Sequence, residues 1–451
     1  MTHRSKRLVA LVAVACASIG AAGCGSDDAG SDDSTAETTA APAVSTTAEV
    51  GSSTTADGSD DATTTPATDG ATTTAAAGSP LGAPNKATGE PITIGYATTG
   101  KNENTDYTYE QSAARATVAY INDYLGGIGG RPIELLTCED GRAEARIATC
   151  INEMLDAEVP LVVTPSTANA TLYANSFTEA GVPWVLNQAA DPTALTSDGV
   201  FVLTDSPAAT IDAPSKIVAA EGAARITYLV IDSPGLIASL QAKADTVYDA
   251  IGAEVDLIGI PPGTADMTPQ VAAALQKDPD EVMIIGNPTF CISGLTALKT
   301  NGYTGGVMLI PQCIDGTVND AVPGGLEGAR LLGFGTSDPA DPDIVLRDAI
   351  YAEYEPDTII DGYTDGAFQT FLGVQRVLGG ITGDITPQSV TEAFRNMPPT
   401  DLPLGAGITY QCDGQRVPGL TAICGNQALV ATFDADGVAR DFEVVELAPA
   451  G

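Results

Sequence analysis

Histidine and positive charge are both scarce in this sequence of 451 residues. His3 is the one histidine, and 20 lysine and arginine residues stand against 58 acidic residues, which gives a formal net charge of −38 at pH 7. A surface this acidic repels nucleic acid and anionic lipid headgroups. We therefore expect no nucleic-acid partner.

The scarcity of histidine also bears on catalysis and metal binding. His3 lies in an N-terminal segment that we expect to be removed. Without it the chain has no Ser-His-Asp or Cys-His nucleophile pair and no histidine-rich metal site. Chemistry that uses carboxylates alone stays open in principle. We predict that the protein is not an enzyme, has no catalytic residue, and needs no cofactor or metal.

The first 24 residues have the order of an export signal. A short basic start, residues 2–7, precedes an apolar run at 8–22 that is too short to span a bilayer comfortably. The following Ala21-Ala22-Gly23-Cys24 resembles the lipobox of bacterial lipoproteins. This resemblance implies that residues 1–23 are a lipoprotein signal peptide. It also implies that lipid on Cys24 anchors the protein to the cell membrane on the extracytoplasmic side. The alternative is an ordinary secretory signal cut nearby, which leaves a soluble product.

Six of the eight cysteines remain once Cys16, within the signal, and Cys24 are set aside. An even number of cysteines in an exported chain favours disulfide bonds. Other pairings are possible, but proximity in the sequence favours three: Cys138 with Cys150, Cys291 with Cys313, and Cys412 with Cys424. A zinc site is the alternative, which the absence of CxxC pairs and of histidine disfavours.

Residues 24–90 have the composition of a flexible segment. After Cys24 they are almost all Ser, Thr, Ala, Gly, Asp and Pro, with no aromatic residue. Such a stretch cannot bury enough apolar surface to offset the entropy lost on ordering. We expect a disordered tether, with an end-to-end distance of about 45 Å for a random coil of this length.

The remaining residues alternate short apolar runs with amphipathic segments. Expected strands lie at 91–96, 133–136, 161–163 and 184–186, and the pattern restarts at 226–231, 282–285 and 307–310. Strands that alternate with helices predict parallel sheets covered on both faces. The length exceeds that of one comfortable core, so we expect an α/β fold with two doubly wound parallel-sheet lobes.

The segment 122–135, NDYLGGIGGRPIEL, carries the most specific pattern. It predicts a helix end, a glycine-rich turn with positive φ and a strand start. A phosphate-binding loop is disfavoured, because the turn runs from helix to strand and brings no helix N-terminus to a ligand. The string resembles a segment of the type I periplasmic binding proteins, most of all the branch that binds branched-chain amino acids and amides for ABC importers.

This resemblance covers about residues 91–447 and implies two lobes joined by three hinge crossovers. Lobe one would take 91–206 and 336–404, and lobe two would take 207–335 and 405–447. The implied function is that of an extracytoplasmic solute-binding lipoprotein. It would close about the hinge on a small amino-acid-like, amide or carboxylate ligand. The implied partners are an ABC permease and, through Cys24, the membrane, with the protein itself a monomer. A sensor of the same fold that signals to a membrane partner is the alternative.

The resemblance also implies where ligand would bind. In lobe one, the loops after the strands supply Ser166, Thr167, Ala189 and Ala190. Asp191 falls where the family usually has Thr, and it is either a helix cap before Pro192 or a ligand contact. The expected ligand-binding set is completed by Thr98 and Tyr107 in lobe one, and by Ser233 and Asp315 in lobe two.

Two positions in lobe two depart from the family's pattern. Segment 232–236 lacks the Tyr that family members often place after the first strand of this lobe. The acid that holds a ligand ammonium would fall nearest Gln312 or Cys313, and Asp315 comes two or three residues late. A simple branched-chain amino acid therefore does not follow from the resemblance.

Overall fold

The computed structural model describes residues 79–102, 106–167, 169–232 and 236–447. The predicted signal peptide, Cys24 and most of the predicted tether lie outside these ranges, as does Ser233. Within them, no helix is long and apolar enough to cross a bilayer.

The first lobe is built on a sheet of five parallel strands in the order β2-β1-β3-β4-β5. These strands are β1 (Ile92–Thr98), β2 (Ile133–Glu139), β3 (Val162–Thr164), β4 (Trp184–Leu186) and β5 (Val200–Val202). The helices that connect them are α1 (Thr108–Tyr124), α2 (Glu144–Asp156), α3 (Ala170–Ala180) and α4 (Pro192–Thr196). Later chain adds α10 (Pro342–Tyr354), α11 (Gly362–Leu378) and α12 (Pro387–Asn396).

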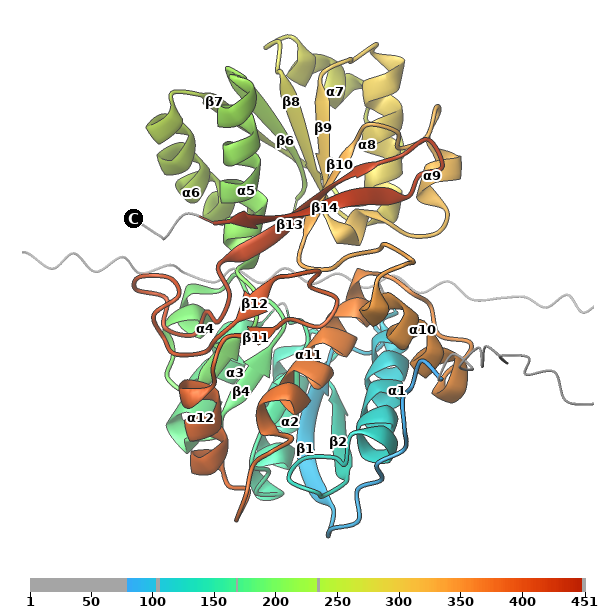
Figure 1. Ribbon diagram of the computed structural model, residues 1–451. Coiled ribbons are helices and arrows are strands. Elements are labelled where there is room, and N and C mark those ends of the chain that lie inside the picture. Colours follow the sequence, from blue (N-terminus) through green and yellow to red (C-terminus); the bar gives the residue numbers. More distant parts are fainter. Residues whose placement is uncertain (1–78, 103–105, 168, 233–235, 448–451) are drawn as a thin grey trace, which may run out of the picture. The chain divides into compact units, whose positions relative to one another are not determined.

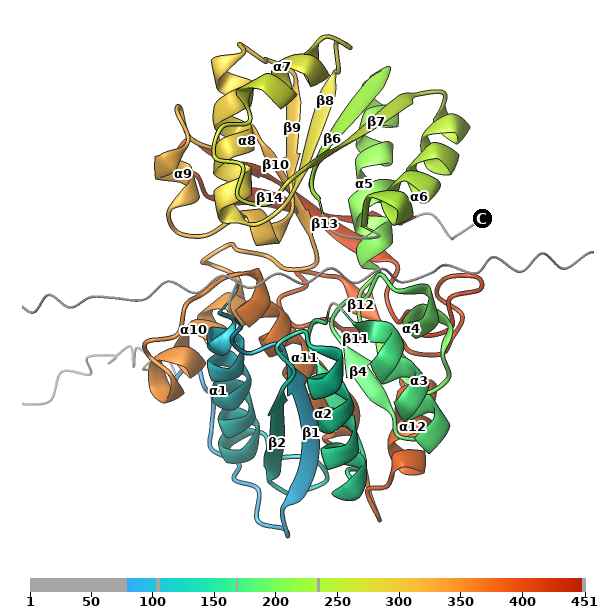
Figure 2. The same cartoon turned by 180° about the vertical axis from the view of Figure 1, so that it is seen from behind.

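Alternate residues of these strands enter separate cores on the two faces of the sheet. Ile94 and Tyr96 join the core formed with α1 and α11, whereas Ala97 and Val162 join the core formed with α2 and α3. Successive side chains of a strand point to opposite faces, so a sheet covered on both faces needs continuously apolar strands. This explains why every residue of β3, β4 and β5 is buried. Figures 1 and 2 show helices on both sides of the sheet.

The second lobe contains a seven-stranded sheet in the order β14-β13-β10-β9-β8-β6-β7. The strands are β6 (Arg225–Ile231), β7 (Glu254–Ile260), β8 (Glu281–Ile285), β9 (Gly306–Leu309), β10 (Arg330–Gly333), β13 (Gln427–Phe433) and β14 (Ala439–Glu446). β6 to β10 are parallel, and β13 and β14 add an antiparallel edge. The helices are α5 (Ser206–Glu221), α6 (Leu236–Ile251), α7 (Thr268–Leu275), α8 (Pro288–Thr300) and α9 (Val318–Ala321). α5 and α6 share one core, and α7 to α9 share the other.

The chain passes between the lobes three times. It crosses from β5 to α5, from β10 to α10, and into β13 after the short hairpin of β11 (Thr400–Asp401) and β12 (Thr409–Tyr410). The predicted α/β fold with parallel sheets is confirmed.

The third crossing comes later than the predicted boundary at residue 404. Cys412 and Cys424 lie in a first-lobe core, and Ile423 pairs with Val202 of β5. The segment up to Cys424 therefore packs on the first lobe, and the second lobe resumes only at β13. Its residues have little apolar periodicity, so the sequence carried no sign of where they pack.

The predicted tether also ends before residue 90. Leu81 and Ala87 are buried, and the backbone N–H groups of Asn85 and Ala87 donate to the carbonyls of Asp123 and Asn122 at the end of α1. Backbone hydrogen bonds thus hold a segment whose composition alone predicts disorder. The first lobe therefore includes Leu81 and Ala87.

The glycine-rich turn after α1 is a structural connection. The side chain of Asn122 donates to the carbonyl of Ile133 at 2.9 Å and accepts from its N–H at 2.7 Å, which fixes the helix end against β2. Gly127 has φ +71°, and a Cβ atom there would lie 2.0 Å from the backbone oxygen of Arg131. Gly130 has φ +81° but open space around its Cβ position. At both positions glycine avoids the backbone strain that a residue with a Cβ atom would have at positive φ. At Gly127 it also avoids a steric clash with the backbone of Arg131.

This difference gives a matched pair of variants. Gly130→Ala should lower the free energy of unfolding by about 1–2 kcal/mol through positive φ alone. Gly127→Ala adds a clash with backbone that cannot move aside, and the combined cost should be roughly 2–5 kcal/mol. Thermal and urea denaturation of the two variants would measure this. Equal costs would show that the turn relaxes around the added methyl group.

Candidate functional site

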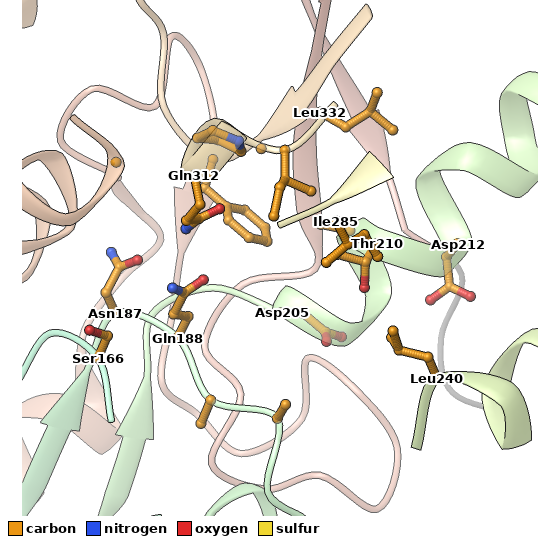
Figure 3. Close-up of a pocket in the computed structure, with 18 of the residues that line it drawn as sticks. Ser166, Asn187, Gln188, Asp205, Thr210, Asp212, Leu240, Ile285, Gln312 and Leu332 are labelled. Atoms are coloured by element: carbon orange, nitrogen blue, oxygen red, sulfur yellow. The ribbon is translucent and has the colours of Figure 1, made fainter. Parts of the chain in front are cut away.

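A cavity of about 660 Å³ lies where strands of both sheets reach their carboxyl ends. The first lobe contributes the loops after β3 and β4 together with α11, and the second contributes α5, α6 and the ends of β8, β9 and β10. Parallel strands deliver their following loops to one edge of the sheet, which is where open α/β sheets bind ligands. Figure 3 shows labelled side chains converging on this space from both lobes.

Two hydroxyl groups follow β3 at the edge of the cavity. Ser166 donates to Oε2 of Glu110 at 3.2 Å, which leaves its oxygen lone pairs to face a ligand. Thr167 accepts the backbone N–H of Asn169 at 3.1 Å, so its own hydroxyl hydrogen can be donated. The pair can therefore offer both an acceptor and a donor to a bound molecule.

Glu110 of α1 lies behind Ser166 and is buried. Its Oε1 atom accepts from the hydroxyls of Tyr96 at 3.1 Å and Thr98 at 3.0 Å. Burial raises the pKa of Glu110 from about 4.5 to about 7, although hydrogen bonds from Thr98, Tyr96 and Ser166 oppose this shift. One carboxyl group thus joins β1, α1 and the loop that carries Ser166.

Amide side chains fix the loop after β4. Nδ2 of Asn187 donates to Oε1 of Gln369 at 3.0 Å, and Nε2 of Gln369 donates to the carbonyls of Phe334 at 2.8 Å and Pro403 at 2.9 Å. Phe334 follows β10, so these bonds tie the β4 loop and α11 to the second crossing. Gln188 comes next in the loop and lies opposite Gln312 of the second lobe in Figure 3.

Charged groups line the cavity along α5 and α6. Asp212 forms an ion pair with Lys243 at 2.8 Å, and Asp205 caps α5 by accepting the N–H of Ala208 at 3.1 Å. Burial raises the pKa of both carboxyl groups, and attraction to Lys243 opposes the shift. Asp365 of α11 pairs with Arg347 at 2.7 Å, and burial raises its pKa to about 6. Lys243 is the one basic side chain among the described residues that line the cavity.

All three predicted disulfides are present. Cys138–Cys150 joins β2 to α2. Cys291–Cys313 joins α8 to the 3₁₀ turn Pro311–Cys313, which carries Gln312. Cys412–Cys424 closes the loop that carries Leu420, another residue of the cavity wall. Two of the three disulfides therefore hold segments that line the cavity.

Of the expected ligand-binding residues, Ser166, Thr167, Ala189 and Ala190 line the cavity. Asp191, between two lining residues, caps α4 by accepting from the N–H groups of Thr193 and Ala194, as its alternative interpretation predicted.

Three further expected residues make other contacts. Thr98 bonds Glu110. Tyr107 packs against Tyr363 in a tilted arrangement, with ring centroids 4.5 Å apart. Asp315 accepts from the N–H and hydroxyl of Thr317 in its own loop. These three residues and Asp191 do not line the cavity.

Other lining residues had no role in the sequence prediction. Gln188 and Gln312 lie in loops that directly follow predicted strands. A search of those loops for polar side chains would have identified both residues. Asp205, Asp212 and Lys243 line the cavity only because α5 and α6 approach the first lobe, and no local pattern signals that approach. No group of three or more described His, Cys, Asp or Glu residues is arranged to hold a metal ion.

Two lobes, three crossings and a cavity between them define a two-lobed solute-binding protein. The chain belongs to the periplasmic binding protein family, whose model matches residues 91–423. The resemblance inferred from the sequence is therefore confirmed. No curated protein matches the sequence.

Solved structures with this fold come from several bacteria. The branched-chain amino acid transporter substrate-binding protein of Streptococcus pneumoniae, with isoleucine, is 19% identical over 79% of this chain and 100% of its own, with a TM-score of 0.62. A solute-binding protein from R. palustris, with 4-hydroxybenzoate, is 15% identical over 80% and 98%, with a TM-score of 0.63. A fatty acid transporter protein from Thermomonospora curvata is 16% identical over 81% and 94%, with a TM-score of 0.64. At these identities the likeness shows the fold and not the ligand.

The placement of the disulfides predicts local changes on their removal. Cys412→Ser/Cys424→Ser should speed amide exchange in the loop that carries Leu420, and Cys291→Ser/Cys313→Ser should do so around Gln312. Each double variant loses a loop constraint of up to about 3 kcal/mol. Cys138→Ser/Cys150→Ser is the control, which should be less stable without faster exchange at either loop. Hydrogen–deuterium exchange with mass spectrometry would measure this, and unchanged exchange in both loops would contradict it.

The pKa of Glu110 predicts how stability depends on pH. In the folded protein the carboxyl group of Glu110 keeps its proton up to about pH 7, whereas in the unfolded chain it keeps the proton only to about pH 4.5. The free energy of unfolding therefore falls as pH rises between these values. Glu110→Gln keeps the shape and removes the ionisation. The variant should be more stable than the parent at pH 8 by up to roughly 3 kcal/mol, with no such gain at pH 4.

Urea denaturation at both pH values would test this prediction. Glu134→Gln, which changes an exposed carboxylate on β2, is the matched control and should give no pH-dependent gain. An equal effect of Glu110→Gln at pH 4 and pH 8 would mean that Glu110 does not titrate in this range.

Proposed function

We propose that this protein is an extracytoplasmic solute-binding protein of an ABC importer, which captures a small molecule between its two lobes. The observation that carries the proposal is that one cavity is lined by strand-end loops of both lobes. Rotation about the three crossings would bring the lobes together and bury a molecule bound there. Family membership over residues 91–423 supports the same role.

The N-terminal segment fits this role as a membrane attachment. Lipid on Cys24 would hold the protein at the outer surface of the cell membrane, within reach of a permease. The residues between Cys24 and the first lobe would link the lipid to the binding protein. A monomer of this kind binds its ligand away from the permease and then docks with it.

The related structures do not narrow the ligand of this protein to one chemical class. They include complexes with isoleucine and with 4-hydroxybenzoate and a substrate-binding protein of a fatty acid ABC transporter, so one fold accepts molecules of different size and charge. The four lining residues Ser166, Thr167, Ala189 and Ala190 form the first-lobe side of the proposed site. Gln312 takes the second-lobe position that Asp315 was expected to fill.

The proposed site predicts a loss of binding in a hydroxyl double variant. Ser166→Ala/Thr167→Ala should weaken ligand binding at least about tenfold, because polar atoms of a buried ligand would lose their partners. The ligand would be identified by mass spectrometry of small molecules released from the purified protein, and affinity measured by calorimetry.

Thr149→Ala/Thr300→Ala is the matched control, since both hydroxyls are exposed on helices and bond only to their own helix carbonyls. It should bind as the parent does. Equal affinity of the Ser166/Thr167 variant and this control would place the binding site elsewhere. The absence of any bound metabolite, in the released material and in calorimetry with cell extract, would count against a solute-binding role.

A further inference from the structure

Apolar side chains from both lobes face the cavity. Leu195 and Leu420 line it from the first lobe, and Leu240 and Val247 of α6 line it from the second. Ile285, the last residue of β8, and Leu332, near the end of β10, also line it, and both are labelled in Figure 3. Leu195, Leu240, Ile285 and Leu332 are already buried, whereas Val247 and Leu420 are half-buried, so an apolar body would remove mainly these last two side chains from water.

The cavity has room for more than an amino acid as the lobes stand in this structure. About 660 Å³ lies in the middle of the range of roughly 300–1,000 Å³ that suits drug-sized molecules. Uncharged hydrogen-bonding groups gather on one side, where Figure 3 shows Ser166, Asn187, Gln188 and Gln312. They are able to hold a polar head, while the rest of the ligand lies between Leu420 and Val247, beside the Asp212–Lys243 ion pair.

The charged groups around the cavity disfavour the binding of a negatively charged ligand. Asp205 and Asp212 are nearly fully buried, and Lys243 is the one described basic side chain on the wall, already paired with Asp212. Asp365 adds another carboxyl group, which Arg347 compensates from outside the cavity. A ligand carboxylate would enter a poorly solvated site that already holds an excess of negative charge.

We propose that the cavity selects an elongated amphipathic ligand that has an apolar body and carries no negative charge. This rests on the proposed solute-binding function and narrows its ligand class. It excludes the carboxylates and small amino acids that the sequence resemblance left open. The polar head bonds to the amide and hydroxyl groups of the two lobes, and the apolar body lies between Leu195 and Leu420 on one side and α6 on the other.

A matched series of ligands tests the class. The neutral fluorescent probe N-phenylnaphthylamine would report the apolar cavity, and octanamide, octylamine, octanoate and leucine would compete with it below their micelle concentrations. Octanamide or octylamine should displace the probe at concentrations at least about tenfold lower than octanoate, and leucine should not displace it. Displacement by octanoate at or below the concentration needed for octanamide would overturn the proposal.

Two variants with controls tie the result to this cavity. Val247→Asp, on the wall, should abolish probe binding, while Ala242→Asp, exposed on the same helix, should not. Asp212→Asn removes one buried negative charge from the wall, so octanoate affinity should rise at least about tenfold with octanamide little changed. Asp245→Asn, exposed on α6, is the control for that change. Equal effects of the wall variants and their controls would contradict the assignment.

The outcomes separate this inference from the proposed function. If a small polar or anionic metabolite binds and Ser166→Ala/Thr167→Ala weakens it, the solute-binding function holds and the ligand class is wrong. If neither the amphipathic series nor cell extract binds, the solute-binding function fails with it.

Discussion

The parallel direction of the strands is the constraint on which the cavity depends. Ser166, Asn187 and Gln312 each follow a strand of a parallel set, so their loops emerge at the carboxyl edge of their sheet. Parallel strands need crossover helices, which cover both faces and make the strands apolar throughout. The same geometry thus builds the core and places the polar loops where the two lobes meet.

Covalent and buried polar contacts then fix those loops. The disulfides Cys291–Cys313 and Cys412–Cys424 hold the segments of Gln312 and Leu420, and Gln369 bonds to both the β4 loop and the second crossing. Glu110 holds the loop of Ser166 to β1 and α1. The walls of each lobe are therefore held in shape, and the three crossings connect the lobes.

The electrostatics of the cavity differ from those of the surface. The acidic exterior reflects composition, whereas Asp205, Asp212 and Lys243 meet because α5 and α6 lie side by side. Because these groups are buried, their charges interact with a bound molecule more strongly than exposed charges do, since screening by water is reduced. The charge of the cavity wall is thus set by a few buried groups and not by the net charge of the chain.

Local patterns in the sequence determined a large part of this protein. The family resemblance implied four lining residues in the loops after β3 and β4. The alternation of strands and helices predicted the two α/β lobes, and the proximity of cysteines along the chain predicted all three disulfides. These features follow from neighbours along the chain. Only the tertiary structure decided that residues up to Cys424 pack on the first lobe, that Asp315 bonds within its own loop, and that Leu240 and Lys243 line the cavity. Such contacts join segments far apart in sequence, and their energy depends on burial and packing that no local pattern encodes.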